Sequence, residues 1–261
     1  MVAQVHDQAR RMGALRAVAL CRCFSGALHF QNGNWSEAAS ALSEAVELYR
    51  KIGGASGESL SLQRQGVLLT AQGDLDHAMA AFHAGVFAAE RATMRSHCLT
   101  RLYSSMARNR IAAGDAEAAA EYLRHGEMAA RRHGHCVTCN ALILPEGVRV
   151  RIALGEISEA DANAAELERI GREFGSAAWM GMARQARGRV ASAQKAWNEA
   201  ATAFADAAVA YRAISAPYDV ARCLAAGASI AVKMGDSPRG AALAAEAAGM
   251  FRDLGAPGIE S

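Results

Sequence analysis

The sequence predicts an all-α fold, a right-handed solenoid built from about six helix pairs. A motif of about forty residues recurs along the 261-residue chain. The composition is 52% hydrophobic and rich in alanine, with only four prolines, which favours closely packed helices. Within each copy, small and apolar residues follow the i, i+3, i+4, i+7 spacing of a helix that buries one face. A fixed period of this length is typical of stacked units that share one continuous core.

Each copy of the motif begins with a small residue, which a glycine or its substitute follows about seven residues later. An apolar residue comes next, and then small or aromatic residues at helical spacing. The first two copies are Gly26, Gly33, Trp35, Ala38, Leu42, Ala45 and Gly66, Gly73, Leu75, Ala78, Phe82, Gly85. Later copies begin at Ala107, Val148, Gly188 and Gly227. The predicted units are 19–58, 59–99, 100–140, 141–180, 181–219 and 220–258, after a partial unit at 1–18.

Each unit divides into two helices joined by a glycine turn. The predicted second helices are Trp35 to about Ile52, Leu75–Ala92, Ala116–Arg132, Ile157–Phe174, Trp197–Ile214 and Ser237–Leu254, each after a shorter first helix. Glycine supplies the left-handed residue that ends the first helix, as at Gly73. Lys195 takes this place in the fifth unit, where a left-handed backbone costs roughly 1 kcal/mol. Pro145 predicts a kink or a late start in the fourth unit's first helix.

Composition also narrows the function. A formal net charge of +2 provides no basic field for direct nucleic-acid binding. The sequence shows neither a run of eighteen apolar residues nor a secretory signal pattern, so we expect a cytoplasmic protein that does not enter membranes. We find no nucleophile with a matching base and no paired carboxylates. The sequence therefore predicts a protein that is not an enzyme.

The repeated skeleton resembles the tetratricopeptide repeat over essentially the whole chain, although these units exceed the usual thirty-four residues. Residues 186–189 and 216–222 also resemble the C-terminal arrays of bacterial ATP-dependent regulators of the LuxR and MalT type. In those proteins the array senses a ligand or a partner. The chain shows neither their phosphate loop nor a helix-turn-helix. The resemblance therefore implies a sensing and partner-recognition region of a transcriptional regulator.

An arginine recurs at the same place in three consecutive units. Arg108, Arg149 and Arg189 each follow the motif's first small residue, at spacings of 41 and 40 residues. In tetratricopeptide-like arrays this place lines the concave groove, and Arg101 is expected on the same surface. Because packed helices lie roughly 8–10 Å apart, we expect a basic rail that binds an acidic protein segment or a small anionic ligand. The alternative is ordinary salt bridges within the groove, to Glu146 or neighbouring acids.

A second cluster combines two histidines with a Cys-x-x-Cys pair at a joint between units. The candidate metal ligands are His97, Cys98, His133, His135, Cys136 and Cys139. These residue types at local spacing are typical of a zinc site. Cys98 and Cys139 are 41 residues apart and are expected at matching places in adjacent units. The alternatives are a redox-active dithiol and cysteines that pack as small apolar residues. We expect no other cofactor.

These patterns leave three functional hypotheses. The first is a binding module that uses the basic groove. The second is a metal- or thiol-responsive sensor that uses the segment 133–139. The third is a scaffold that self-associates through the N-terminal partial unit, whose incomplete pair leaves an apolar face to cover.

Overall fold

The computed structural model describes residues 2–132, 134 and 136–258, and these form thirteen helices and no strand. The helices are α1 (Val2–Arg11), α2 (Leu15–Gln31), α3 (Trp35–Lys51), α4 (Ala55–Ala71), α5 (Leu75–Ala89), α6 (Arg95–Ala112), α7 (Ala116–Arg132), α8 (Val137–Ala153), α9 (Ile157–Glu173), α10 (Ala177–Ala193), α11 (Trp197–Ala213), α12 (Pro217–Lys233) and α13 (Ser237–Leu254). They confirm the predicted all-α solenoid. None of the described helices is long and apolar enough to span a bilayer.

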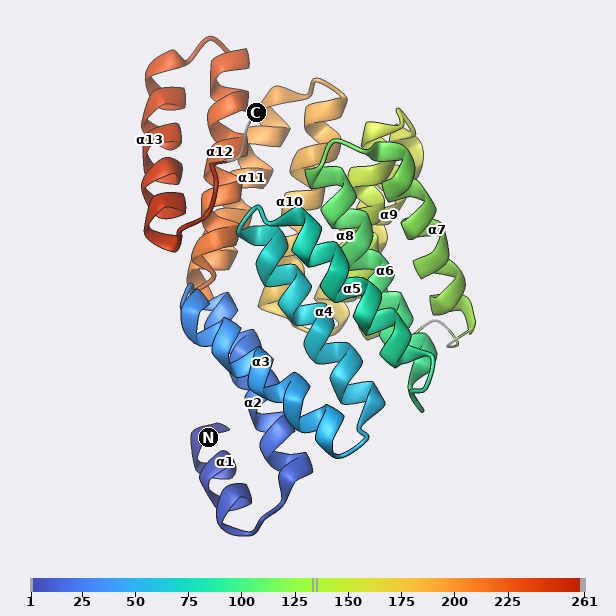
Figure 1. Ribbon diagram of the computed structural model, residues 1–261. Helices are drawn as coiled ribbons and strands as arrows, with labels where there is room; N and C mark the ends of the chain where they lie inside the picture. The colour runs from blue at the N-terminus through green and yellow to red at the C-terminus, as the bar shows by residue number, and fades with distance from the viewer. Residues whose placement is uncertain (1, 133, 135, 259–261) are drawn as a thin grey trace.

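Consecutive helices pack as six hairpins, from α2–α3 to α12–α13, with α1 lying against α2 (Figure 1). From α2 to α10, the first helix of one pair also packs against the first helix of the next, as α4 does against α6 and α6 against α8. The even-numbered helices therefore form one layer of the array, and the side chains on that layer come from successive units.

The turns within the pairs follow the sequence pattern. Gly73 has a φ of +81°, and Lys195 takes the same left-handed conformation with a φ of +62°, as predicted. Asp74, next to Gly73, caps α5 by accepting a hydrogen bond from the backbone N–H of His77. These residues stop one helix and start the next within three residues, which keeps the paired helices side by side.

Two predictions about the first helices are wrong. These helices are not shorter than their partners, because the glycine-rich stretch before Leu60 belongs to α4. Gly57 is helical there, and the ring of Tyr49 lies over it, 2.1 Å from where a Cβ would be, so only glycine fits at this place. Likewise, the late start that Pro145 suggested for α8 is wrong, since this helix begins at Val137 and continues through Pro145; the alternative, a kink at Pro145, stays a prediction.

Large side chains of the second helices pack directly against glycines of the first helices. A Cβ on Gly66 would lie 2.3 Å from the ring of Phe82, and one on Gly188 would lie 2.9 Å from the ring of Phe204. Phe82 is fully buried. The small residue and the aromatic sixteen positions later are therefore one packing unit, which explains why the motif carries both.

We expect Gly66→Ala to lower the free energy of unfolding by about 1–3 kcal/mol, because the added methyl displaces Phe82 from a filled core. The matched control is Gly227→Ala, at the equivalent place in α12, where the nearest atom to an added Cβ is 3.6 Å away. There the better helix propensity of alanine raises stability by about 0.5–1 kcal/mol. Urea denaturation of both variants measures the difference, and equal effects would contradict this packing.

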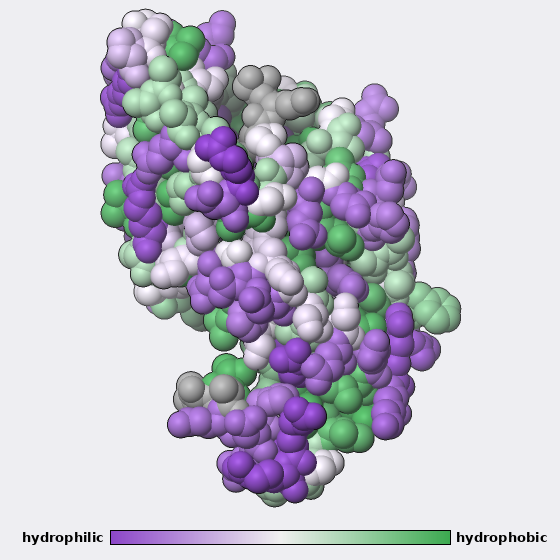
Figure 2. Space-filling view, turned by 60° about the vertical axis from the view of Figure 1, so that its left-hand side comes forward, coloured by the Kyte–Doolittle hydropathy of each residue, from purple (hydrophilic) through white to green (hydrophobic). Residues whose placement is uncertain are grey.

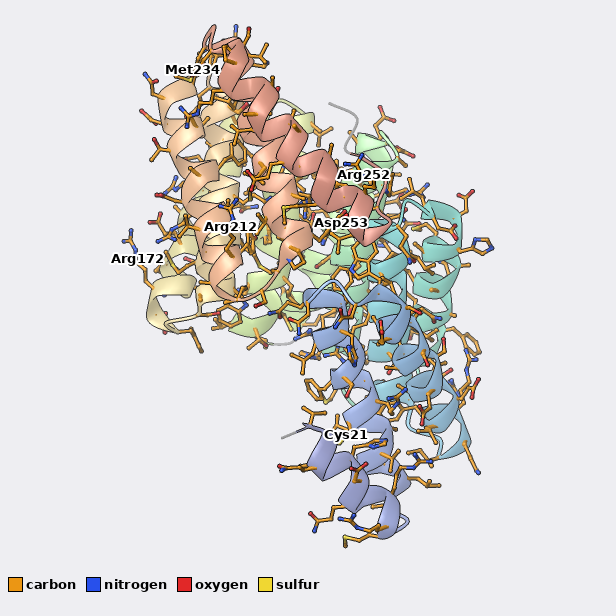
Figure 3. All side chains as sticks on the ribbon, turned by 90° about the vertical axis from the view of Figure 1, so that its left-hand side faces the viewer. Cys21, Arg172, Arg212, Met234, Arg252 and Asp253 are labelled. Atoms are coloured by element: carbon orange, nitrogen blue, oxygen red, sulfur yellow. The ribbon has the colours of Figure 1, made fainter. Side chains whose placement is uncertain are left out.

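The first and sixth helix pairs contact each other and close the array. The ring of Trp35 lies 5.4 Å from that of Tyr218, centroid to centroid. Gln31 Nε2 donates a hydrogen bond of 2.7 Å to the carbonyl of Ile214. Leu254, at the end of α13, packs against the α2–α3 turn. Figure 3 shows this end of α13, near Arg252 and Asp253, beside the α2–α3 pair. The inner layer therefore surrounds a central space instead of lining an open groove.

An apolar stripe lies exposed near the N-terminal end. Leu20, Phe24 and Leu28 recur every four residues along α2 and are 49%, 47% and 46% exposed. Figure 2 shows a hydrophobic patch beside the mostly hydrophilic surface at this end of the molecule. Self-association through this region stays a prediction.

Candidate anion-binding cavity

The inner layer encloses an open cavity of about 750 Å³. Most of its lining comes from α4, α6, α8, α10 and α12, with further residues from the start of α5, from α11 and from the segment after α13. The lining residues are Thr70, Ala71, Gly73, Leu75, Arg108, Ile111, Ala112, Arg149, Ile152, Arg189, Ser192, Ala193, Phe204, Tyr218, Arg222, Ala226, Ser229, Ile230, Pro257 and Gly258. Pro257 packs on Gly73, so the contact between the ends also closes one side of this cavity.

Four arginines reach the cavity, one from each of four successive first helices. Arg108, Arg149 and Arg189 come from α6, α8 and α10, and Arg222 comes from α12. The first three are the residues that the sequence pattern places in a rail. The solenoid repeat thus carries guanidinium groups from four units to one space.

Two carboxylates lie among these arginines in the described structure. Glu146 Oε2 is 3.5 Å from Arg149 Nε, and Arg222 Nη1 donates to Asp219 Oδ1 at 3.1 Å. Glu146 is only 7% exposed, and its Oε2 lacks a hydrogen-bond partner among the described atoms. Four guanidinium groups against two carboxylates leave two positive charges uncompensated.

Burial and the surrounding charges shift the pKa values of Arg189 and Arg108 in opposite directions. Burial, and then the charge of Arg149, lower the pKa of Arg189 to about 9. Burial also lowers the pKa of Arg108, but the charges of Glu146, Tyr218, Asp219 and Tyr211 together outweigh it and hold this pKa above its ordinary value. Burial and the neighbouring guanidinium of Arg149 both disfavour the charged form of Arg189, which a nearby anion would favour.

The walls of the cavity are partly apolar. Ile111, Ile152 and Ile230 line it, together with the ring of Tyr218. The guanidinium of Arg222 lies over the ring of Tyr218, 5.6 Å from the ring centroid, in a cation–π contact. This combination suits a small molecule with two negative charges and a short carbon skeleton, since planar guanidinium groups bind carboxylate and phosphate through paired hydrogen bonds.

The structure separates Arg101 from the other predicted groove residues. Arg101 is not among the residues that line the cavity; its Nε donates instead to His97 Nε2 at 3.0 Å. Arg101 lies almost two turns before Arg108 on α6, which places it about 10 Å further along the helix. Arg222 was missed because Ala228 holds the ladder position in its unit. The sequence feature that could have indicated Arg222 is Asp219, which lies one helical turn earlier and pairs with it.

The predicted metal ligands come together only in part. Three of them, His97, Cys136 and Cys139, each place one ligand atom within 4.8 Å of the other two. His97 Nδ1 is 3.1 Å from Cys139 Sγ. Cys98 does not belong to this group: its thiol is buried and donates to the carbonyl of Ser56 at 3.8 Å. The predictions for His133 and His135 fall outside the described residues.

The two cysteines of the Cys-x-x-Cys pair have different surroundings. Burial, together with the hydrogen bond and charge of Cys136, raises the pKa of Cys139 to about 12. Burial also raises the pKa of Cys136, but hydrogen bonds with Thr138 and Cys139 outweigh it and hold this pKa below its ordinary value. Cys136 is the half-buried member of the pair, and Cys139 is fully buried.

Comparisons with known proteins bear on the fold. No protein-family model matches the sequence, and the search of curated proteins finds no match. Among solved structures, the chain is similar to the one described as the crystal structure of BtubC (BKLC) from P. vanneervenii. The TM-score is 0.59 at 15% sequence identity, over 83% of this chain and 90% of that chain. The chain is therefore an all-helical solenoid of repeated helix pairs, an architecture used for binding and scaffolding.

Proposed function

We propose that this protein is a non-catalytic binding module whose central cavity takes a small dianionic ligand. The observation that carries the proposal is the convergence of Arg108, Arg149, Arg189 and Arg222 on one space with two carboxylates to balance them. Two bound negative charges would complete the balance. The apolar walls favour a dicarboxylate or a phosphate ester over a bare inorganic ion.

The joined ends of the array favour a small ligand over an acidic protein segment. Contacts of Trp35 with Tyr218 and of Gly73 with Pro257 join the first, second and sixth helix pairs around the cavity. An extended peptide in the groove would have to part these contacts. A small anion needs no such opening.

The same contacts support a sensing role. A dianion bound by α6, α8, α10 and α12 would draw four units together and stabilise the closed array, so ligand occupancy would change the stiffness of the whole module. The resemblance to tetratricopeptide arrays of LuxR- and MalT-type regulators supports the same role, with the module as the sensing part of a transcriptional regulator.

Isothermal titration calorimetry with succinate, inorganic phosphate and pyrophosphate tests the proposal. We expect 1:1 binding of at least one of these probes, and affinity that falls as salt is added. Because each lost charge-assisted hydrogen bond costs about 1.5–3 kcal/mol, Arg149→Ala and Arg189→Ala should each weaken binding by roughly 10- to 150-fold.

Arg169→Ala is the matched control, since Arg169 lies exposed on α9 and pairs with Glu166 and Glu173. It should leave the affinity unchanged. If Arg169→Ala and Arg189→Ala lose the same affinity, the binding is non-specific charge attraction and the proposal is overturned. Binding of a polyglutamate peptide in preference to all three small anions would instead assign the cavity to an acidic protein partner.

A further inference from the structure

We propose that His97, Cys136 and Cys139 form a zinc site that ties the first turn of α6 to the first turn of α8. The site lies apart from the arginine cavity, and none of its residues lines that cavity. It is therefore independent of anion binding.

The geometry is close to that of a bound ion. Zinc lies about 2.3 Å from cysteine sulfur and about 2.0–2.1 Å from histidine nitrogen, so tetrahedral ligands stand roughly 3.3–3.8 Å apart. His97 Nδ1 and Cys139 Sγ are 3.1 Å apart, and all three ligand atoms fall within 4.8 Å of one another. Small side-chain rotations bring the set to bonding geometry without moving either helix.

The helix start explains why the two cysteines face the same way. Cys136 is the N-cap of α8, with φ −54° and ψ 116°, and Cys139 follows one turn later. Residues three apart at a helix start lie on one side. His97 lies in the first turn of α6, 42 residues before Cys139 and one residue before Cys98, which holds the matching place in the repeat. The packing of α6 against α8 brings the ligands together.

The donor set selects the metal. Thiolate and imidazole ligands favour zinc over magnesium or calcium, which prefer oxygen. Two thiolates neutralise the charge of a zinc ion. The described residues thus supply three of the four ligands of a tetrahedral zinc site.

Arg101 must change partner when the metal binds. A neutral imidazole that ligates through Nδ1 carries its proton on Nε2. Arg101 Nε donates to that same Nε2 at 3.0 Å, and two donors cannot share the contact. Zinc binding therefore releases Arg101 from His97, and the charges of Cys139 and Cys136, which act on Arg101, would then attract it.

Titration of metal-free protein with Co²⁺ and then Zn²⁺ tests the site. We expect one equivalent of cobalt to give sulfur-to-metal charge transfer and the intense visible bands of tetrahedral coordination, and zinc to displace it. Because loss of an outer-shell partner already costs up to about 100-fold in metal affinity, Cys139→Ala and His97→Ala should each lose at least that much. Cys98→Ala, next to His97 in sequence but outside the site, should bind like the wild type.

A second measurement on the wild-type chain covers the case in which a variant fails to fold, which circular dichroism reports. Alkylation followed by mass spectrometry should show that zinc slows modification of the half-buried Cys136. Unchanged alkylation of Cys136 at saturating zinc, or full cobalt binding by folded Cys139→Ala, would overturn the site. The site would also be overturned if Cys98→Ala lost cobalt binding while His97→Ala bound cobalt normally.

Discussion

Glu146→Gln is expected to lower the free energy of unfolding by about 3–5 kcal/mol, the range for breaking a buried ion pair by removing one partner. Glu146 is buried on α8, 3.5 Å from Arg149, and its charge also acts on Arg108 and Arg189. The glutamine keeps the shape of the side chain and removes only the charge. Four guanidinium groups then face the single carboxylate of Asp219.

Phosphate separates this electrostatic effect from simple damage to packing. Urea denaturation of Glu146→Gln should show a larger stabilisation by added phosphate than the wild type shows, because the anion replaces the lost charge. Glu166→Gln on α9 is the control, since Glu166 is exposed and pairs with Arg169, and its effect should stay within about 0.5 kcal/mol. A variant that phosphate stabilises no more than the wild type would show that the cavity holds no excess positive charge.

Trp35→Ala is expected to cost about 3–5 kcal/mol, the usual loss for truncating a buried aromatic side chain. Trp35 is 4% exposed, stacks on Phe30 at 5.9 Å between ring centroids, and meets Tyr218 edge-on. Truncation removes the core of the contact between the first and sixth helix pairs. Small-angle scattering should therefore show a larger radius of gyration, together with the loss of stability.

Trp197→Ala is the matched comparison, because Trp197 begins α11 as Trp35 begins α3. Trp197 is only half-buried and packs beneath the ammonium of Lys233, away from the joined ends. Its truncation should cost less and leave the radius of gyration unchanged. Equal expansion in both variants would mean that the joined ends do not hold the array closed.

The sequence predicted the helix pairs well because their signals are local. The spacing of small and apolar residues marks the second helices, and left-handed turns such as Gly73 and Lys195 mark where they start. The length of α4 was predicted wrongly because it depends on a contact with another helix, which has no local signal. Gly57 looks like a turn residue in sequence, but this glycine lies within α4 and makes room for the ring of Tyr49 on the preceding helix.

The candidate site was predicted in part for the same physical reason. Arg108, Arg149 and Arg189 hold one place in the repeat, so stacking alone aligns them. Arg222 joins them through the curvature of the array, which sums small rotations between units and leaves no local signal. Cys98 and His97 are neighbours in sequence, but adjacent helical residues point about 100° apart. Only His97 faces the Cys-x-x-Cys pair.

Joining the ends also changes how the molecule comes apart. In an open array each unit touches only its neighbours, so the outermost repeats fray first and melting spreads inward. Here the α2–α3 pair and the α12–α13 pair shield each other through Trp35, Tyr218 and Leu254. Hydrogen exchange should therefore show similar protection at both ends and in the middle, with a single cooperative melting step. The number of units is fixed for the same reason, since adding or removing one pair would carry these three side chains out of reach.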